Sequence, residues 1–136
     1  MRNLRGDGVK AEIKKHENII RRVAVDQQVD PRLIKAIIYE EMTHQLPGEN
    51  TLELFGAGNT FGLGQVTEGY FGYSAKELWN PKIGIYAIGR HLNNLQSQPL
   101  INHDRPVESI ATKYNCGGCS EIRDYGKRVR SYMSYF

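Results

Sequence analysis

The sequence has little cysteine, no long apolar run and no dense tract of either charge. Two cysteines in 136 residues are too few for the disulfide framework of a small secreted scaffold. No uninterrupted apolar stretch approaches the roughly 20 residues that a bilayer-spanning helix needs, so we expect no membrane span. The basic residues are spread from Arg2 to Arg130 and leave a net charge of only +3, which argues against nucleic acid as a partner.

The remaining composition is that of a globular domain. The chain is 40% hydrophobic and 24% charged, close to ordinary folded proteins, and its length suits one domain covering residues 1–136. The mildly basic surface suits any anionic polymer, including a cell wall that carries carboxylates. A compact enzyme or a binding module fits these limits.

Helical patterns account for most of the chain. An amphipathic helix is expected over about Val9–Val25, within residues 1–28, because the apolar residues there follow helical spacing. Asp30 and Asn80 each precede a proline, and an Asp or Asn cap followed by Pro is a strong helix start. The helix that starts at Asn80 should end before Pro99, and Asp104 and Pro106 should start a helix that Gly117 and Gly118 stop. A last helix is expected over about Glu121–Phe136, and a capping box at Ser74 and Glu77.

Strand patterns are nearly missing from the sequence. Residues 45–60 are rich in glycine, proline and asparagine, which predicts a long loop that holds at most a short hairpin. The sequence therefore predicts an all-α single domain with, at most, a minor β-hairpin.

The two cysteines, Cys116 and Cys119, lie in a Cys-Gly-Gly-Cys segment. A zinc site would need two further ligands, and no second pair of suitable spacing is present. A redox motif of the thioredoxin type would need strands that the helical pattern does not supply. An optional disulfide and a pair of plain thiols both remain open.

Glu40 and Glu41 end a helix whose preceding residues are almost wholly apolar, just before the glycine-rich loop. Partial burial of a carboxyl disfavours its charged form and raises its pKa, as a general acid at neutral pH requires. The alternative is that both are solvated glutamates in the last turn of a helix.

Three segments in order resemble the signature motifs of goose-type lysozymes and soluble lytic transglycosylases. They are Ala36–Glu41 (Ala-Ile-Ile-Tyr-Glu-Glu), Gly58–Val66 (Gly-Asn-Thr-Phe-Gly-Leu-Gly-Gln-Val) and Ala111–Gly117 (Ala-Thr-Lys-Tyr-Asn-Cys-Gly). The resemblance covers about residues 29–136, the catalytic region, and implies a lysozyme-like fold. In its register the catalytic acid falls on Glu41, and Glu40 takes a variable position.

The resemblance also implies which residues line a glycan-binding cleft between the helix that starts at Asp30 and the 45–65 loop. These are Phe61, Gly62, Leu63, Gln65, Tyr114 and Asn115. The chain departs from the family at Gly64, where the family has Met, and at Met42, where it has Ser. Tyr114 has a plainer interpretation as a core aromatic on the apolar stripe of its helix.

The implied activity is cleavage of the β-1,4 bond between N-acetylmuramic acid and N-acetylglucosamine in peptidoglycan. Glu53 is the candidate second carboxylate, which would activate water. We favour hydrolysis over transglycosylation to an anhydro product, because Gly58–Phe61 looks more like the goose-type pattern. No cofactor or metal is expected, and we expect a monomer.

Two rival functions come from other classes. The first is a module that binds glycan without cutting it. The second is a metal-dependent hydrolase, suggested by the spacing of Glu40 and Glu41 to His44, although one such pair lacks the second half of known metal motifs.

The resemblance places the action in the periplasm or cell wall. The segment Met1–Lys15 is polar where a signal peptide would be apolar. We therefore expect another domain, a secretion system or a phage lysis system to deliver the domain, and an immunity or inhibitor protein is a conceivable partner.

Overall fold

The computed structural model describes residues 4–45, 56–57, 60–61, 66–67 and 80–136, and these are predominantly helical. The helices are α1 (Leu4–Lys15), α2 (Glu17–Gln27), α3 (Pro31–Glu40), α5 (Pro81–Gln96), α6 (Pro106–Asn115) and α7 (Asp124–Tyr132), with a π-helical turn η1 (Glu41–Gln45) after α3 and a 3-10 turn η3 (Met133–Tyr135) after α7. The predicted all-α single domain is confirmed. No helix in the described part of the chain is long and apolar enough to cross a membrane.

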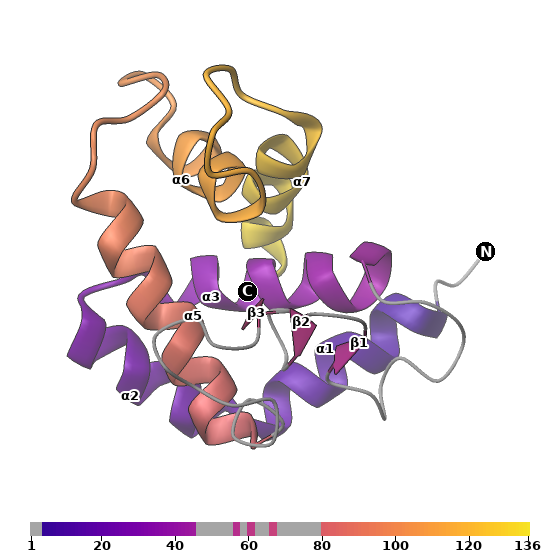
Figure 1. The fold of residues 1–136 in the computed structure, drawn as a ribbon. Coiled ribbons are helices and arrows are strands. Elements are labelled where there is room, and N and C mark those ends of the chain that lie inside the picture. Colours follow the sequence, from indigo (N-terminus) through magenta and orange to yellow (C-terminus); the bar gives the residue numbers. More distant parts are fainter. Residues whose placement is uncertain (1–3, 46–55, 58–59, 62–65, 68–79) are drawn as a thin grey trace.

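Helix α3 is the centre of the molecule. It crosses the middle of Figure 1, with α6 and α7 on one side of it and α1 and α2 on the other. Its side chains are buried on nearly every face, including Leu33, Ile34, Ile37 and Ile38. A helix that is apolar all round can be stable in water only when other elements cover it, and here α1, α2, α5 and α7 all contact α3.

The start of α3 follows the predicted chemistry. The side chain of Asp30 accepts a hydrogen bond from the backbone N–H of Arg32 at 2.8 Å, and Pro31 is the first helical residue. Asn80 does the same for α5 by accepting from the N–H of Lys82 at 3.0 Å. Helix α5 then ends at Gln96, before Pro99, as expected.

The N-terminal region differs from the prediction, because two helices replace the single one expected over residues 9–25. The N–H of His16 donates to the carbonyl of Ile13 at 3.0 Å, a short-range bond that breaks the α-helical pattern between α1 and α2. Val9 and Ile13 enter the core from α1, and Ile20 and Val23 enter it from α2. The apolar spacing runs across the break, so the sequence pattern does not mark it.

Two other helix starts also differ from the prediction. Asp104 does not cap α6, because Arg105 occupies the cap position and makes no side-chain bond there. The N–H of Asp104 donates to the side chain of Asn102 at 2.9 Å. The last helix begins at Asp124 and not near Glu121, because Arg123 is extended and its N–H donates to Thr112 Oγ1 at 3.1 Å.

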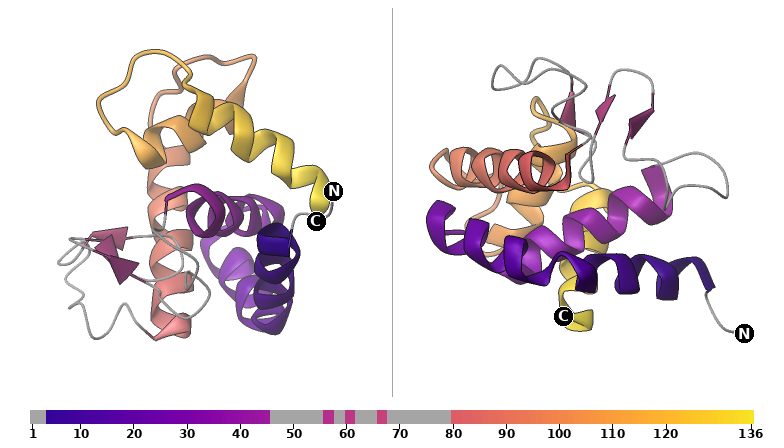
Figure 2. Two further views of the ribbon diagram at one scale, coloured as in Figure 1. Left: turned by 90° about the vertical axis from the view of Figure 1, so that its right-hand side faces the viewer. Right: turned by 90° about the horizontal axis from the view of Figure 1, so that it is seen from below.

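A small antiparallel sheet accompanies the helices. Its strands β1 (Gly56–Ala57), β2 (Thr60–Phe61) and β3 (Val66–Thr67) pair in sequence order. The minor hairpin expected in the 45–60 loop is thus present as β1 and β2, and β3 adds a third strand. Both views of Figure 2 place the sheet and the α1–α2 pair on opposite sides of α5, and β3 contacts that helix. The capping box expected at Ser74 and Glu77 lies outside the described residues.

Candidate active site

Glu41 is a buried carboxyl at the junction of α3 and η1. Only 5% of the residue is exposed, and the apolar turns of α3 lead directly to it. Its Oε1 atom accepts a hydrogen bond from the hydroxyl of Tyr125 at 2.7 Å. Tyr125 lies in the first turn of α7 and is itself buried, so the two groups meet in a part of the molecule that excludes bulk water.

The protonation state of Glu41 follows from this environment. Burial raises its pKa to about 8, the Tyr125 hydrogen bond opposes that shift, and the neighbouring Glu40 charge adds to it. The carboxyl therefore keeps its proton at neutral pH, which is the condition for a general acid. Burial first, and then the nearby Glu41 charge, raise the pKa of Tyr125 well above its ordinary value, so the phenol stays a hydrogen-bond donor.

Glu40, the adjacent acid, has a different partner. It is fully buried, and its two carboxylate oxygens accept hydrogen bonds from Nε and Nη2 of Arg128 at 2.9 and 2.8 Å. This two-point contact is the strong geometry for an arginine–carboxylate pair, and it favours the ionised carboxylate. One of the two acids is thus held as an anion and the other as a neutral group.

Helix α7 supplies partners for the whole end of α3. Tyr125, Arg128 and Tyr132 are spaced three and four residues apart, so they lie on one face of α7. The Tyr132 hydroxyl is 2.9 Å from Nε2 of His44, and the two rings are nearly parallel at 7°. Burial, with the charge of Glu40, raises the pKa of Tyr132 to about 12.

Tyr114 belongs to the same cluster. It is a partly buried residue of α6 that packs against the core, as the plainer interpretation expected, and it lies close enough to Tyr125 to contribute to the raised pKa of that residue. Its ring contacts His91 of α5 at a centroid distance of 4.8 Å. Burial lowers the pKa of His91 to about 4, so this imidazole is neutral. Asn115 is the exposed last residue of α6.

The sequence analysis did not single out Tyr125, Arg128 or His91. A signal existed for Tyr125, since it precedes Val129 by four residues and therefore shares the apolar face of the last helix. The partner it meets is 84 residues away in sequence. Local pattern does not carry information on such a pairing.

The remaining predicted site residues lie in the middle of the chain, where the structure describes residues 56–57, 60–61 and 66–67. Phe61 is in β2, where it pairs with Gly56 and with Val66, and its side chain is not described. Glu53, Gly62, Leu63 and Gln65 lie outside the described residues. The second carboxylate and the loop side of the cleft therefore stay predictions.

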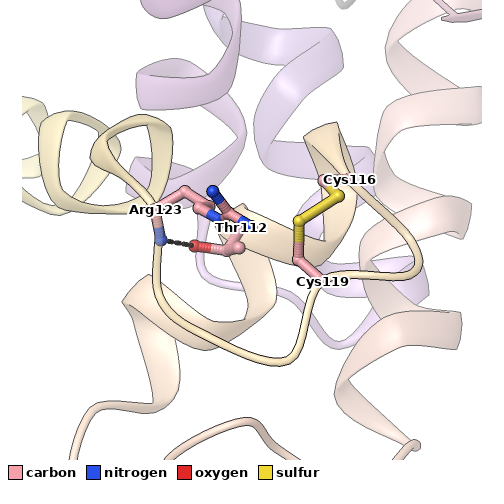
Figure 3. The surroundings of a disulfide bond; sticks show 4 residues. All are labelled: Thr112, Cys116, Cys119 and Arg123. Atoms are coloured by element: carbon pink, nitrogen blue, oxygen red, sulfur yellow. Dashed lines mark hydrogen bonds between the residues drawn. A yellow bond between two sulfur atoms is a disulfide. The ribbon is translucent and has the colours of Figure 1, made fainter.

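Cys116 and Cys119 form a disulfide, which decides between the two alternatives left open by the sequence. Their Cα atoms are 5.5 Å apart, and the bond closes the turn directly after α6, next to the contact between Thr112 and Arg123 (Figure 3). The chain then returns as α7, which packs closely against α6: a Cβ at Gly126 would collide with the Glu108 carbonyl oxygen and with Thr112 Oγ1. The disulfide turn therefore lies between the helix that carries Tyr114 and the helix that carries Tyr125.

The residues suggested for a metal site have other partners. Glu40 is bound by Arg128, and His44 by Tyr132. Within the described ranges, no group of three or more His, Cys, Asp or Glu side chains is arranged to hold a metal ion.

Comparison with known proteins identifies no relative of this chain. No protein-family model matches the sequence, no curated protein matches it, and no solved structure matches its fold.

Proposed function

We propose that this chain is a peptidoglycan-cleaving muramidase in which Glu41 is the general acid. The observation that carries the proposal is the state of Glu41: a buried carboxyl with a pKa of about 8, next to a glycine-rich loop and hydrogen-bonded by a tyrosine. The resemblance of three ordered segments to goose-type lysozymes and lytic transglycosylases supplies the substrate class. Glycan strands of the bacterial cell wall are the proposed partner.

In the proposed reaction, Glu41 gives its proton to the bridging oxygen as the bond from that oxygen to the anomeric carbon of N-acetylmuramic acid breaks. The electron pair of the bond leaves with the N-acetylglucosamine hydroxyl, and positive charge develops on the muramic ring. Glu41 is then an anion, which the Tyr125 hydroxyl stabilises by the hydrogen bond that it already donates at 2.7 Å.

Two acceptors can complete the reaction. In hydrolysis, water attacks the muramic anomeric carbon, gives its proton to the candidate base Glu53 and leaves a reducing muramic acid. In transglycosylation, the muramic C6 hydroxyl attacks the same carbon, forms an internal ether and returns its proton to Glu41. We place hydrolysis first because Gly58–Phe61 resembles the goose-type pattern, with Glu53 as the candidate base. Transglycosylation is the alternative, and it fits the described residues in one respect: the other buried acid, Glu40, is held by Arg128.

The deciding experiment measures release of soluble fragments from purified sacculi. Glu41→Gln keeps the size of the side chain but cannot donate a proton, and we expect turnover to fall by at least about 10²-fold. Glu121→Gln, the same change at an exposed loop residue, is the matched control and should match wild type. Mass spectrometry of the products separates the reducing from the anhydro form.

The same assay tests the rival functions. Sacculi that bind wild type but are never cut would indicate a glycan-binding module. Turnover that a strong chelator abolishes, and that Glu41→Gln leaves intact, would indicate a metal-dependent hydrolase.

A further inference from the structure

Adjacent residues at the end of α3 each bind α7, and the two bonds differ in kind. Glu41 accepts from the phenol of Tyr125, and Glu40 accepts twice from the guanidinium of Arg128. The left view of Figure 2 shows α7 passing over α3, and both bonds join these two helices at the end of α3. Of the two, only the Glu40–Arg128 contact joins opposite charges.

We propose that Glu40 and Arg128 are a positioning pair for the acid: together they hold α7 against the end of α3 so that Tyr125 reaches Glu41, and each offsets part of the charge of the other beside that carboxyl. The inference rests on the proposed function for its role in catalysis. The charge balance itself is a property of the protein and can be measured without a substrate.

The geometry explains why the pair needs both members. Glu40 is fully buried, and a buried carboxylate without a counter-charge is strongly disfavoured. Arg128 reaches this carboxylate from one turn beyond Tyr125, while 38% of its side chain remains exposed. Removing either residue alone would leave the charge of the other without its partner at the end of α3, and removing both would remove both charges.

Other titratable and charged groups surround this junction, and none of them supplies the same balance. The end of α3 and η1 carry Tyr39 and His44, and α7 and η3 carry Asp124, Tyr125, Tyr132 and Tyr135. The other helices contribute Tyr114 from α6, His91 from α5, and Asp7 and Lys10 from α1. His91 is neutral, and Lys10 lies over the ring of Tyr135. Arg128 contacts both carboxylate oxygens of Glu40, and Tyr132, which brings no charge, also hydrogen-bonds Glu40.

The signs of the expected effects follow from Coulomb's law. Glu40→Gln leaves Arg128 as a lone cation, which favours the carboxylate of Glu41, so the basic limb of the pH–activity profile should move down by about one pH unit. Arg128→Met leaves the buried Glu40 without its counter-charge. Ionisation of both neighbouring carboxyls is then less favourable, and the limb should move up by a similar amount.

The double variant Glu40→Gln with Arg128→Met is the decisive measurement. Its limb should lie between those of the two single variants, because the double variant carries neither charge. With Glu41 starting at about 8, a downward move of about one unit gives Glu40→Gln about a threefold loss at pH 7.5 and almost none at pH 6, beyond any loss at every pH from a displaced Tyr125. Arg128→Lys keeps the charge without the two-point contact, so its limb should stay in place.

Carbon-13 NMR titration of the Glu41 carboxyl, assigned by its loss in Glu41→Gln, gives the same shifts without any substrate. If sacculi are never cut but the titration shifts as described, the proposed function fails and the positioning pair stands. Single variants that move the titration in the same direction, or leave it unmoved, would overturn the pair.

A purely structural role gives a different pattern. It would lower turnover equally at every pH, and the double variant would be no better than the worse single variant. If a single variant loses its cooperative melting transition, the double variant and Arg128→Lys carry the test, and a double variant whose limb differs from wild type by a full unit contradicts the proposal.

Discussion

Replacing Tyr125 by Phe removes one hydroxyl and leaves the shape of the ring in place. The hydroxyl donates to Glu41 at 2.7 Å, and this bond lowers a carboxyl pKa that burial has raised to about 8. Without it, the carboxylate that remains after proton transfer loses its donor. We therefore expect Tyr125→Phe to be slower than wild type, yet to keep its activity to a higher pH.

The size of the effect can be worked from the contact. A hydrogen bond to a charged group contributes about 1.5–3 kcal/mol, and only part of that charge has formed at the transition state. About half of it, roughly 0.8–1.5 kcal/mol, corresponds to a turnover about 4- to 12-fold slower. Stability should fall by about 1–2 kcal/mol, because the buried Oε1 atom of Glu41 is left without its donor.

The assay is fragment release from sacculi between pH 5 and pH 9.5, beside thermal melting. Tyr86→Phe is the matched control, because Tyr86 is an exposed tyrosine of α5 and should behave as wild type. A Tyr125→Phe variant with wild-type turnover, or one whose basic limb moves to lower pH, would refute the reasoning.

Three further predictions follow from the described residues. Because the folded pKa of Glu41 is about 8 against an ordinary 4.5, the stability that its proton contributes is full below pH 4.5 and is lost as the pH rises through 8. The free energy of unfolding of Glu41→Gln should therefore rise relative to that of wild type by on the order of 3–5 kcal/mol across that range. The same difference in melting temperature between the two proteins at pH 5 and at pH 8.5 would contradict this. A double serine variant of Cys116 and Cys119 should lose about 2 kcal/mol, the loop-closure value for so short a ring, and should keep most of its activity under reducing conditions; failure to fold on reduction would contradict it. Gly126→Ala should lower the melting temperature through the collision of its Cβ with α6, whereas Gly117→Ala, with open space around it, should not.

The sequence predicts most of the helices because their starts are local events. At Asp30 and Asn80 a short polar side chain bonds the N–H two residues on, and proline follows at once, so the whole signal fits in three residues. Asp104 carries the same residue type but does not cap α6, because proline follows it one residue later than at those two starts and the cap position falls on Arg105. Pro106, two residues after Asp104, has no N–H to donate to its side chain.

The break at His16 and the partners of the two acids lie beyond sequence reasoning for another reason. The break leaves the apolar periodicity intact, so only the packing of α1 and α2 against α3 reveals it. Arg128 meets Glu40 across 88 residues. The sequence predicts a catalytic acid at this pair and places it on Glu41 by the register of the family resemblance. The spacing of Tyr125 and Arg128 on α7 gives the two acids different partners.

That spacing gives two identical side chains opposite protonation states. Glu40 and Glu41 are chemically the same and both are buried, so burial alone would raise the pKa of each. The difference comes from what α7 places against them: a guanidinium, which favours the anion, and a phenol, which donates one bond and brings no charge. The guanidinium allows the first acid to ionise in the core, while burial and the charge of that acid favour the protonated form of the second. The protonation of Glu41 therefore comes first from its own burial, and the ion pair beside it decides how much the Glu40 charge adds.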